Sequence, residues 1–243
     1  PRAEFDETTV ATLVAILGTT ISPYLFFWQA SEEVEEEEKE GLVPAALPPA
    51  GMRRLLRASH VDVFTGMVFA NVGFYFVVLT AAASLHASGQ TDVSTAAEAA
   101  EALRPLAGGL ASWLFALGMI GTGLLAIPVL AGSSAYATSE LFGWREGLGA
   151  TFRQAPQFYG VIAAATLFGI VLNFAGVGEI TALYVAAIIN GVTAPLLLVV
   201  IMLAAGDERV LGDYRPGHLL LGIGWLTAIV MGAAAVALFV TLA

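Results

Sequence analysis

Long apolar tracts alternate with short polar segments along the whole chain, and this pattern sets the expected architecture. Six tracts contain no Asp, Glu, Lys or Arg, and each is long enough to cross a bilayer, whose hydrocarbon core takes about 20 helical residues. We predict a helix in every tract because lipid offers backbone groups no hydrogen-bond partner and a helix satisfies its own. The predicted spans are about residues 9–30, 63–85, 108–132, 158–176, 181–205 and 218–241.

Composition supports an all-α polytopic membrane protein with six transmembrane helices. Hydrophobic residues make up 58% of the 243 positions and charged residues 12%, about half the usual share in a soluble domain. Eight of the ten Lys and Arg residues fall on one set of alternate connections, which the positive-inside rule places in the cytoplasm. We therefore expect a multi-pass protein of the plasma (inner) membrane, in contact with the lipid bilayer, with both ends of this chain outside.

The charge of the chain is concentrated rather than spread. Much of the net charge of −10 comes from glutamates that follow the first tract, so residues 31–60 are interpreted as an acidic cytoplasmic loop. Charge runs of this kind usually solvate a surface, although this one can also collect cations at a pore mouth. An acidic chain without a basic patch argues against nucleic-acid binding. The absence of cysteine excludes disulfides and thiolate metal sites.

The first tract contains a predicted helix break. Pro23 lies mid-span, has no N–H, and its ring clashes with the carbonyl of Thr19, while Ser22 is displaced from helical geometry. Gly18 adds backbone freedom, and the hydroxyls of Thr20 and Ser22 lie near the freed oxygen. The break is either a simple kink that hydroxyl groups satisfy, or an unwound segment whose carbonyls coordinate a cation, as in transporters.

Polar groups inside other spans give further candidates. Asn71 is either a helix–helix hydrogen-bonding residue or part of a permeation pathway. Gly191 and Pro195 predict a second interruption, beside Asn190 and Thr193.

Catalytic groups are missing from the predicted spans. An intramembrane enzyme needs paired acids, a serine with a base, or a histidine cluster, and no span contains Asp, Glu or Lys. We therefore predict no enzymatic activity and no cofactor.

Three stretches resemble a known family. The stretches are GTTISPYLFFWQASEEVEEE, DVFTGMVFANVGFYFVVLTAAASLH and LAGGLASWLFALGMIGTGLLAIPVLAGSSAYATSE, and they resemble the sixth, seventh and eighth helices of the NRAMP divalent-metal transporters. The resemblance implies that the chain is helices six to eleven, the second half of an inverted-repeat (LeuT-like) fold. The first five helices, with the family's Asp-Pro-Gly motif, would then be missing, so we expect a fragment whose partner is that N-terminal half.

The resemblance also assigns roles to residues of the break. The family's carbonyl ligand falls on Thr19, its metal-binding methionine on Ser22, and its proton-linked histidine on Tyr24, with Thr20 nearby in the pathway. A hydroxyl ligand suits Mg²⁺ or Mn²⁺ better than a thioether does, and a phenol carries protons poorly at neutral pH.

The family's tenth-helix amide falls on Asn190 or Gly191, and Thr193 is assigned to the pathway beside it. Thr19, Ser22 and Asn190 are thus the predicted metal ligands.

These departures resemble the NRAMP-related magnesium transporters. They predict transport of Mg²⁺ and/or Mn²⁺ as the substrate. Two alternatives stay open: a proton-coupled Fe²⁺/Mn²⁺ transporter of the NRAMP type, and a truncated membrane scaffold that transports nothing.

Overall fold

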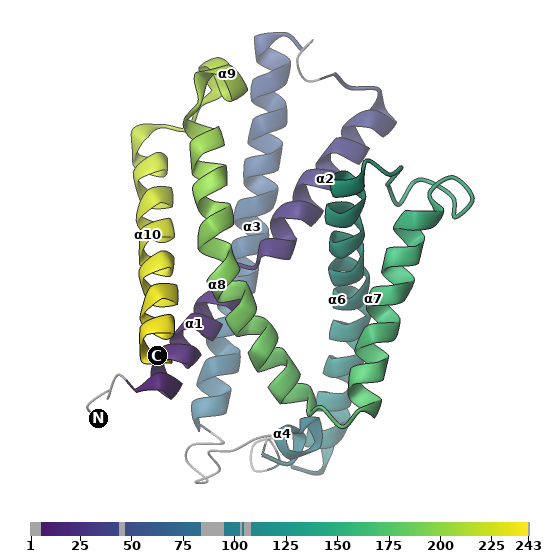
Figure 1. Cartoon of the computed structure of the whole chain (residues 1–243), viewed down its shortest axis with the longest axis vertical. Helices are drawn as coiled ribbons and strands as arrows, with labels where there is room; N and C mark the ends of the chain where they lie inside the picture. Colours follow the sequence, from purple (N-terminus) through teal and green to yellow (C-terminus); the bar gives the residue numbers. More distant parts are fainter. Residues whose placement is uncertain (1–5, 44–46, 84–94, 103, 105–107, 243) are drawn as a thin grey trace. The chain divides into compact units, whose positions relative to one another are not determined.

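The computed structural model describes residues 6–43, 47–83, 95–102, 104 and 108–242. This part of the chain is nearly all helical, and six of its helical segments are long and apolar enough to cross a membrane (Figure 1). The elements are α1 (Glu7–Thr20), α2 (Pro23–Glu40), α3 (Pro49–Ala81), α4 (Ala96–Ala102), η3 (Gly108–Leu110), α6 (Ala111–Phe142), α7 (Pro156–Phe174), α8 (Glu179–Gly206), α9 (Glu208–Leu211), η4 (Gly212–Tyr214) and α10 (His218–Thr241).

The ends of these helices follow from local chemistry. The carboxylate of Asp6 caps α1 by accepting a hydrogen bond of 2.9 Å from the N–H of Thr9. Prolines occupy the first position of α3 and α7, where the missing N–H costs nothing. α6 ends at Phe142, the next residue Gly143 has a φ of 65°, and the N–H of Trp144 closes the helix on the carbonyl of Ser139.

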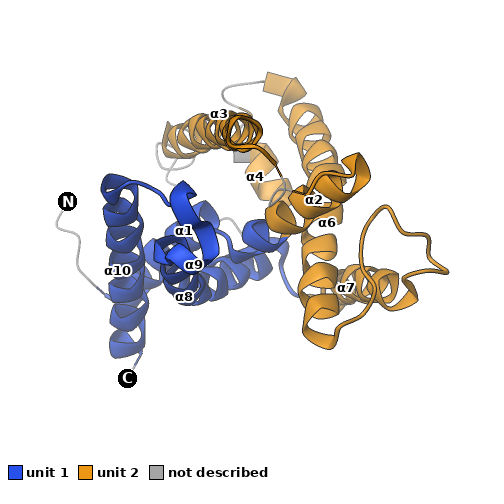
Figure 2. Cartoon of the chain, turned by 90° about the horizontal axis from the view of Figure 1, so that it is seen from above, with its two compact units in different colours: residues 1–27, 177–243 blue, residues 28–176 orange. Residues whose placement is uncertain are grey.

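The chain divides into two compact units, shown in different colours in Figure 2. The first unit comprises residues 1–27 and 177–243, and its helices α1, α8 and α10 pack against one another. Figure 1 shows α8 and α10 side by side in this unit. Its core is apolar and consists of Val10, Val14 and Leu238, surrounded by Ala11, Ile188, Val192 and Ala234.

The second unit comprises residues 28–176, with α6 packed along α7. Its core contains Tyr136 and Phe158, whose rings meet edge to face at 4.9 Å between centroids. α3 buries no residue, and Phe64 and Phe69 are 72% and 75% exposed on it. An apolar helix with so much exposed hydrophobic surface has the surface expected for contact with lipid.

Two sequence expectations need correction here. The predicted acidic loop of residues 31–60 is partly helical in the described residues, because α2 continues to Glu40 and α3 begins at Pro49. Glutamate and lysine favour helix, and nothing before Gly41 stops α2. The third apolar tract does not end as a helix near residue 132 either, since α6 runs on to Phe142. Residues 84 and 85 of the second predicted span lie outside the described part of the chain.

The extension of α6 has a physical cause. The small residues Ala131, Gly132 and Ala135 are buried and let neighbouring elements approach closely. Hydroxyl groups beyond residue 132 bond back to the helix itself: Ser134 Oγ donates to the carbonyl of Leu130 at 3.0 Å. Polarity at this end of α6 therefore does not interrupt the helix.

Candidate functional site

The first apolar tract is divided into two helices in the structure. α1 ends at Thr20 and α2 begins at Pro23, so Ile21 and Ser22 lie between them in non-helical geometry. The N–H of Ile21 still bonds to the carbonyl of Leu17 at 2.9 Å, which makes it the last donor of α1. Pro23 has no N–H to continue the ladder, so the carbonyls of the last turn depend on side chains for their partners.

Ser22 provides that partner. Its side chain is buried, with 4% exposure, and its Oγ donates toward the carbonyls of Gly18 at 2.9 Å and Thr19 at 3.3 Å. A hydroxyl has one proton and two lone pairs. Because the proton of Ser22 is directed at these carbonyls, the lone pairs of Oγ stay available to a hydrogen-bond donor or a cation.

The threonine hydroxyls at the break are used differently. Thr19 Oγ1 and Thr20 Oγ1 both donate to the carbonyl of Ile16 at 2.8 Å, and both side chains are exposed. The group that Thr19 offers to a ligand is therefore its main-chain oxygen rather than its hydroxyl. Tyr24 follows Pro23 as a half-buried residue of the first turn of α2.

Two glycines bring the end of α1 against the middle of α8. A Cβ added to Gly18 would overlap the carbonyl oxygen of Ala187 and the backbone nitrogen of Gly191, and would lie 2.8 Å from Gly191 Cα. A Cβ at Gly191 would overlap the carbonyl oxygen of Val14 in the same way. Backbone contact this close requires glycine on both helices. Gly18 directly precedes Thr19, and Gly191 directly follows Asn190. The crossing of α1 and α8 therefore lies next to both Thr19 and Asn190 in the sequence.

α8 contributes polar groups near this crossing without being interrupted. The half-buried side-chain amide of Asn190 has no hydrogen-bond partner within the described residues. Thr193 Oγ1 donates to the carbonyls of Ile189 at 2.9 Å and Asn190 at 3.2 Å.

The predicted second break at Gly191 and Pro195 is wrong, because α8 is one helix from Glu179 to Gly206. Pro195 lacks the N–H that would bond to the carbonyl of Gly191, but it is buried inside α8, where packing against neighbouring helices keeps the helix continuous.

The structure adds a polar contact between the same helices that sequence reasoning missed. Thr12 Oγ1 and the hydroxyl of Tyr184 lie 3.3 Å apart, joining α1 to α8. Neither residue stands out in the sequence, since threonine and tyrosine are common in membrane helices. Asn71, by contrast, lies on α3 in the second unit, where its Nδ2 donates to the carbonyl of Met67 at 2.8 Å.

The donor set at the break is composed of neutral oxygens. The candidates are the Thr19 carbonyl, the Ser22 hydroxyl and the Asn190 amide, all from the first unit. In the described part of the chain, no group of three or more His, Cys, Asp or Glu residues is arranged to hold a metal ion. Neutral oxygens coordinate hard cations weakly, so a dication at this position needs an additional anionic ligand.

Comparisons with known proteins match almost the whole chain. Residues 1–241 match the family described as natural resistance-associated macrophage protein-like, or Nramp. A protein named divalent metal cation transporter MntH from Aeromonas hydrophila subsp. hydrophila is 26% identical over 220 residues, which cover 89% of this chain and 49% of that protein.

Relatives of the same name occur in Xanthomonas campestris pv. campestris and Ralstonia nicotianae, each 25% identical, over 242 and 230 residues. These alignments cover 95% and 91% of the chain, but 50% and 48% of the relatives. The chain thus spans about half the length of the curated relatives it matches.

Proposed function

Because the chain belongs to the natural resistance-associated macrophage protein-like (Nramp) family, we propose that the protein containing it transports divalent metal cations across a membrane. The relatives in three bacteria carry the name divalent metal cation transporter, which supports this substrate class. Six helices long and apolar enough to span a bilayer fit a multi-pass membrane protein, and we assign it to the plasma membrane.

The more specific proposal is that the cation is Mg²⁺ and/or Mn²⁺ and that it binds at the break between α1 and α2. The observation that carries it is the buried Ser22 hydroxyl, hydrogen-bonded to the carbonyls of Gly18 and Thr19. These oxygens are hard ligands, and no soft thioether or thiolate accompanies them at the break. Asn190, on the helix that crosses α1 at Gly18, would supply an amide oxygen.

The remaining ligands are proposed to come from outside this chain. A dication surrounded only by neutral oxygens would be poorly stabilised in a low-dielectric membrane site. We propose that the chain is helices six to eleven of an inverted-repeat fold, and that the first five helices supply the anionic ligand. Thr20, Tyr24, Asn71 and Thr193 would then line the pathway.

Two other functions are compatible with the family. A proton-coupled Fe²⁺/Mn²⁺ transporter is disfavoured because Tyr24 replaces the family's histidine after the proline, and a phenol exchanges protons poorly near neutral pH. A membrane scaffold that transports nothing would need no ligand set, whereas Ser22 lies just after α1 and Asn190 lies on α8, and these two helices meet at Gly18 and Gly191.

Ion flux into proteoliposomes containing the full-length protein tests the proposal. We expect uptake of Mg²⁺ and Mn²⁺ without acidification of the lumen. Ser22→Ala should reduce Mg²⁺ uptake, because it removes a ligand and leaves two carbonyls without their donor. Ser134→Ala is the matched control, since Ser134 Oγ bonds within α6 and the side chain is exposed.

The outcomes separate the alternatives. Uptake of Fe²⁺ or Cd²⁺ with rejection of Mg²⁺ would show that the hard-ligand argument is wrong. Proton flux coupled to metal uptake would favour the second function, and the absence of any divalent flux would favour the scaffold.

A further inference from the structure

One glutamate of the acidic run is engaged with the protein rather than with solvent. Glu35 lies in the part of α2 that belongs to the second unit, and its side chain is 14% exposed. Its Oε1 accepts a hydrogen bond of 2.8 Å from the N–H of Leu148, and its Oε2 accepts one of 3.2 Å from the N–H of Gly149. A single carboxylate therefore holds two consecutive amides of the connection between α6 and α7.

A buried tyrosine adds a third donor. The hydroxyl of Tyr136 on α6 donates to Glu35 Oε1, and the N–H of Leu148 also lies 3.3 Å from that hydroxyl. Tyr136 is 1% exposed and packs edge to face against Trp28 and Phe158. Trp28 comes from α2 as well, so α2 contacts α6 through both an aromatic and a carboxylate contact.

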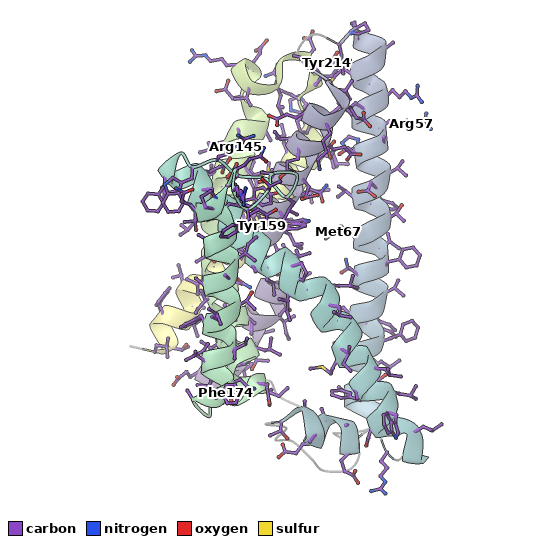
Figure 3. All side chains as sticks on the ribbon, turned by 90° about the vertical axis from the view of Figure 1, so that its right-hand side faces the viewer. Arg57, Met67, Arg145, Tyr159, Phe174 and Tyr214 are labelled. Carbon is purple, nitrogen blue, oxygen red and sulfur yellow. The ribbon has the colours of Figure 1, made fainter. Side chains whose placement is uncertain are left out.

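The connection is shaped to receive this carboxylate. Gly147 has a φ of 119°, and a Cβ there would lie 2.9 Å from Glu35 Oε1. Tyr159, labelled in Figure 3, holds the same segment from α7 by donating to the carbonyls of Ala150 at 2.8 Å and Leu148 at 3.3 Å. Bonds from α2, α6 and α7 thus converge on residues 147–150.

Neighbouring glutamates do not share this arrangement. Glu36, Glu38 and Glu40 are exposed, and Glu35 alone of the acidic run accepts hydrogen bonds from backbone amides of another element within the described residues. Hydrogen bonds to a charged acceptor are about twice as strong as neutral ones. The run is therefore not simply a solvated surface.

We propose that Glu35 is a positioning residue of the transport cycle: it fixes the C-terminal half of α2 to the α6–α7 connection, so that these parts of the second unit move together. This inference rests on the proposed function. Thr19 and Ser22 are held by their own bonds and by the crossing at Gly18, none of which involves Glu35. Loss of the Glu35 contact should accordingly change the rate of the conformational step and leave metal affinity unchanged.

The first test is hydrogen exchange on the full-length protein, with Glu35→Gln compared with Glu38→Gln. Both variants remove one negative charge from α2, but Glu38 is exposed. The two amides bond to different oxygens of Glu35, and glutamine replaces one of these oxygens with an NH2 donor, so exchange at Leu148 and Gly149 should accelerate by about tenfold or more. Tyr136→Phe should give a smaller acceleration, since it removes one donor and keeps both amide bonds. Equal exchange in the Glu35 and Glu38 variants would overturn the proposed contact.

The second test is metal flux with the same variants. Glu35→Gln should lower the maximal rate about fivefold or more while KM for Mg²⁺ stays within about twofold, and Glu38→Gln should match the wild type. Accelerated exchange with unaltered flux would overturn the positioning role. If Glu35→Gln does not fold, Tyr136→Phe replaces it, and its maximal rate and KM for Mg²⁺ are compared with those of the wild type in the same way. Failure of the wild-type protein to transport any divalent cation would count against the proposed function. The hydrogen-exchange comparison would then still test the contact between Glu35 and the amides of Leu148 and Gly149.

Discussion

Gly18 of α1 and Gly191 of α8 meet backbone to backbone. A Cβ on Gly18 would overlap the backbone nitrogen of Gly191, and a Cβ on Gly191 would overlap the carbonyl oxygen of Val14. The contact fixes the last turn of α1 beside the centre of α8. It therefore holds the end of α1, where the break begins, against α8.

Alanine at either glycine should destabilise the first unit. Gly18→Ala or Gly191→Ala forces the helices apart, an overpacking effect of about 1–3 kcal/mol. Thermal unfolding in detergent measures the change. Gly222→Ala on α10 is the control, because nothing lies within 4 Å of its added Cβ and alanine favours helix. Stability unchanged in the Gly18 and Gly191 variants would show that the crossing is looser than described.

Methionine at Ser22 should shift ion preference toward soft metals. The substitution replaces a hydroxyl with a thioether and removes the donor to the Gly18 and Thr19 carbonyls. We expect the ratio of Cd²⁺ to Mg²⁺ uptake to rise about tenfold, equivalent to ~1.4 kcal/mol of relative affinity. Competitive flux in proteoliposomes measures the ratio, with Ser134→Met as the control. An unaltered ratio in the Ser22 variant would argue that Ser22 does not contact the ion.

Alanine at Ser139 should stabilise the second unit. Ser139 on α6 is fully buried, and its Oγ has no hydrogen-bond partner within the described residues. Removing a buried hydroxyl without a partner relieves its desolvation cost, so the free energy of unfolding should rise by about 1 kcal/mol. Ser134→Ala, which loses an exposed and satisfied hydroxyl, should stay within about 0.5 kcal/mol of the wild type. A fall in stability for Ser139→Ala would reveal a partner for this hydroxyl.

Glu146 should make stability depend on pH. Burial raises the pKa of the Glu146 carboxyl above its ordinary value of 4.5, and the charges of Glu140 and Glu35 raise it further. Folding therefore favours the protonated form of Glu146. The stability that this preference contributes is complete below pH 4.5, and it is lost as the pH rises through the folded-state pKa.

Glu146→Gln tests this sign. The variant should melt at a higher temperature than the wild type at neutral pH, and the difference should disappear below about pH 4.5. Glu38→Gln provides the control for a lost exposed charge. A difference that grows on acidification would contradict the expected sign.

The sequence alone determined the six apolar helices and the membrane class, because both depend on local composition. A tract without charges has few options in lipid other than a helix. The starts of α1 and α7 also have local causes, in Asp6 and Pro156, although the predicted spans begin two residues later than the helices do. The family assignment needed only the sequence as well, through residues 1–241. The ligand roles of Thr19, Ser22 and Asn190 remain predictions.

The tertiary structure decided which of two similar prolines accompanies a break. Pro23 lacks the same N–H as Pro195, yet α1 stops before Pro23 while α8 continues through Pro195. Pro195 is buried within packed helices, so the one carbonyl that it leaves without a donor, that of Gly191, does not unwind α8. Sequence rules describe the lost hydrogen bond but not the packing that offsets it.

The structure also selected Glu35 from a run of glutamates that look alike in the sequence. Its amide partner Leu148 is 113 residues away, a separation that no local pattern reports. The same holds for Thr12 and Tyr184, which are 172 residues apart and meet through the packing of α1 on α8. Local composition fixes which segments become helices, whereas contacts between distant segments depend on how side-chain volumes and backbone surfaces fit once those helices pack.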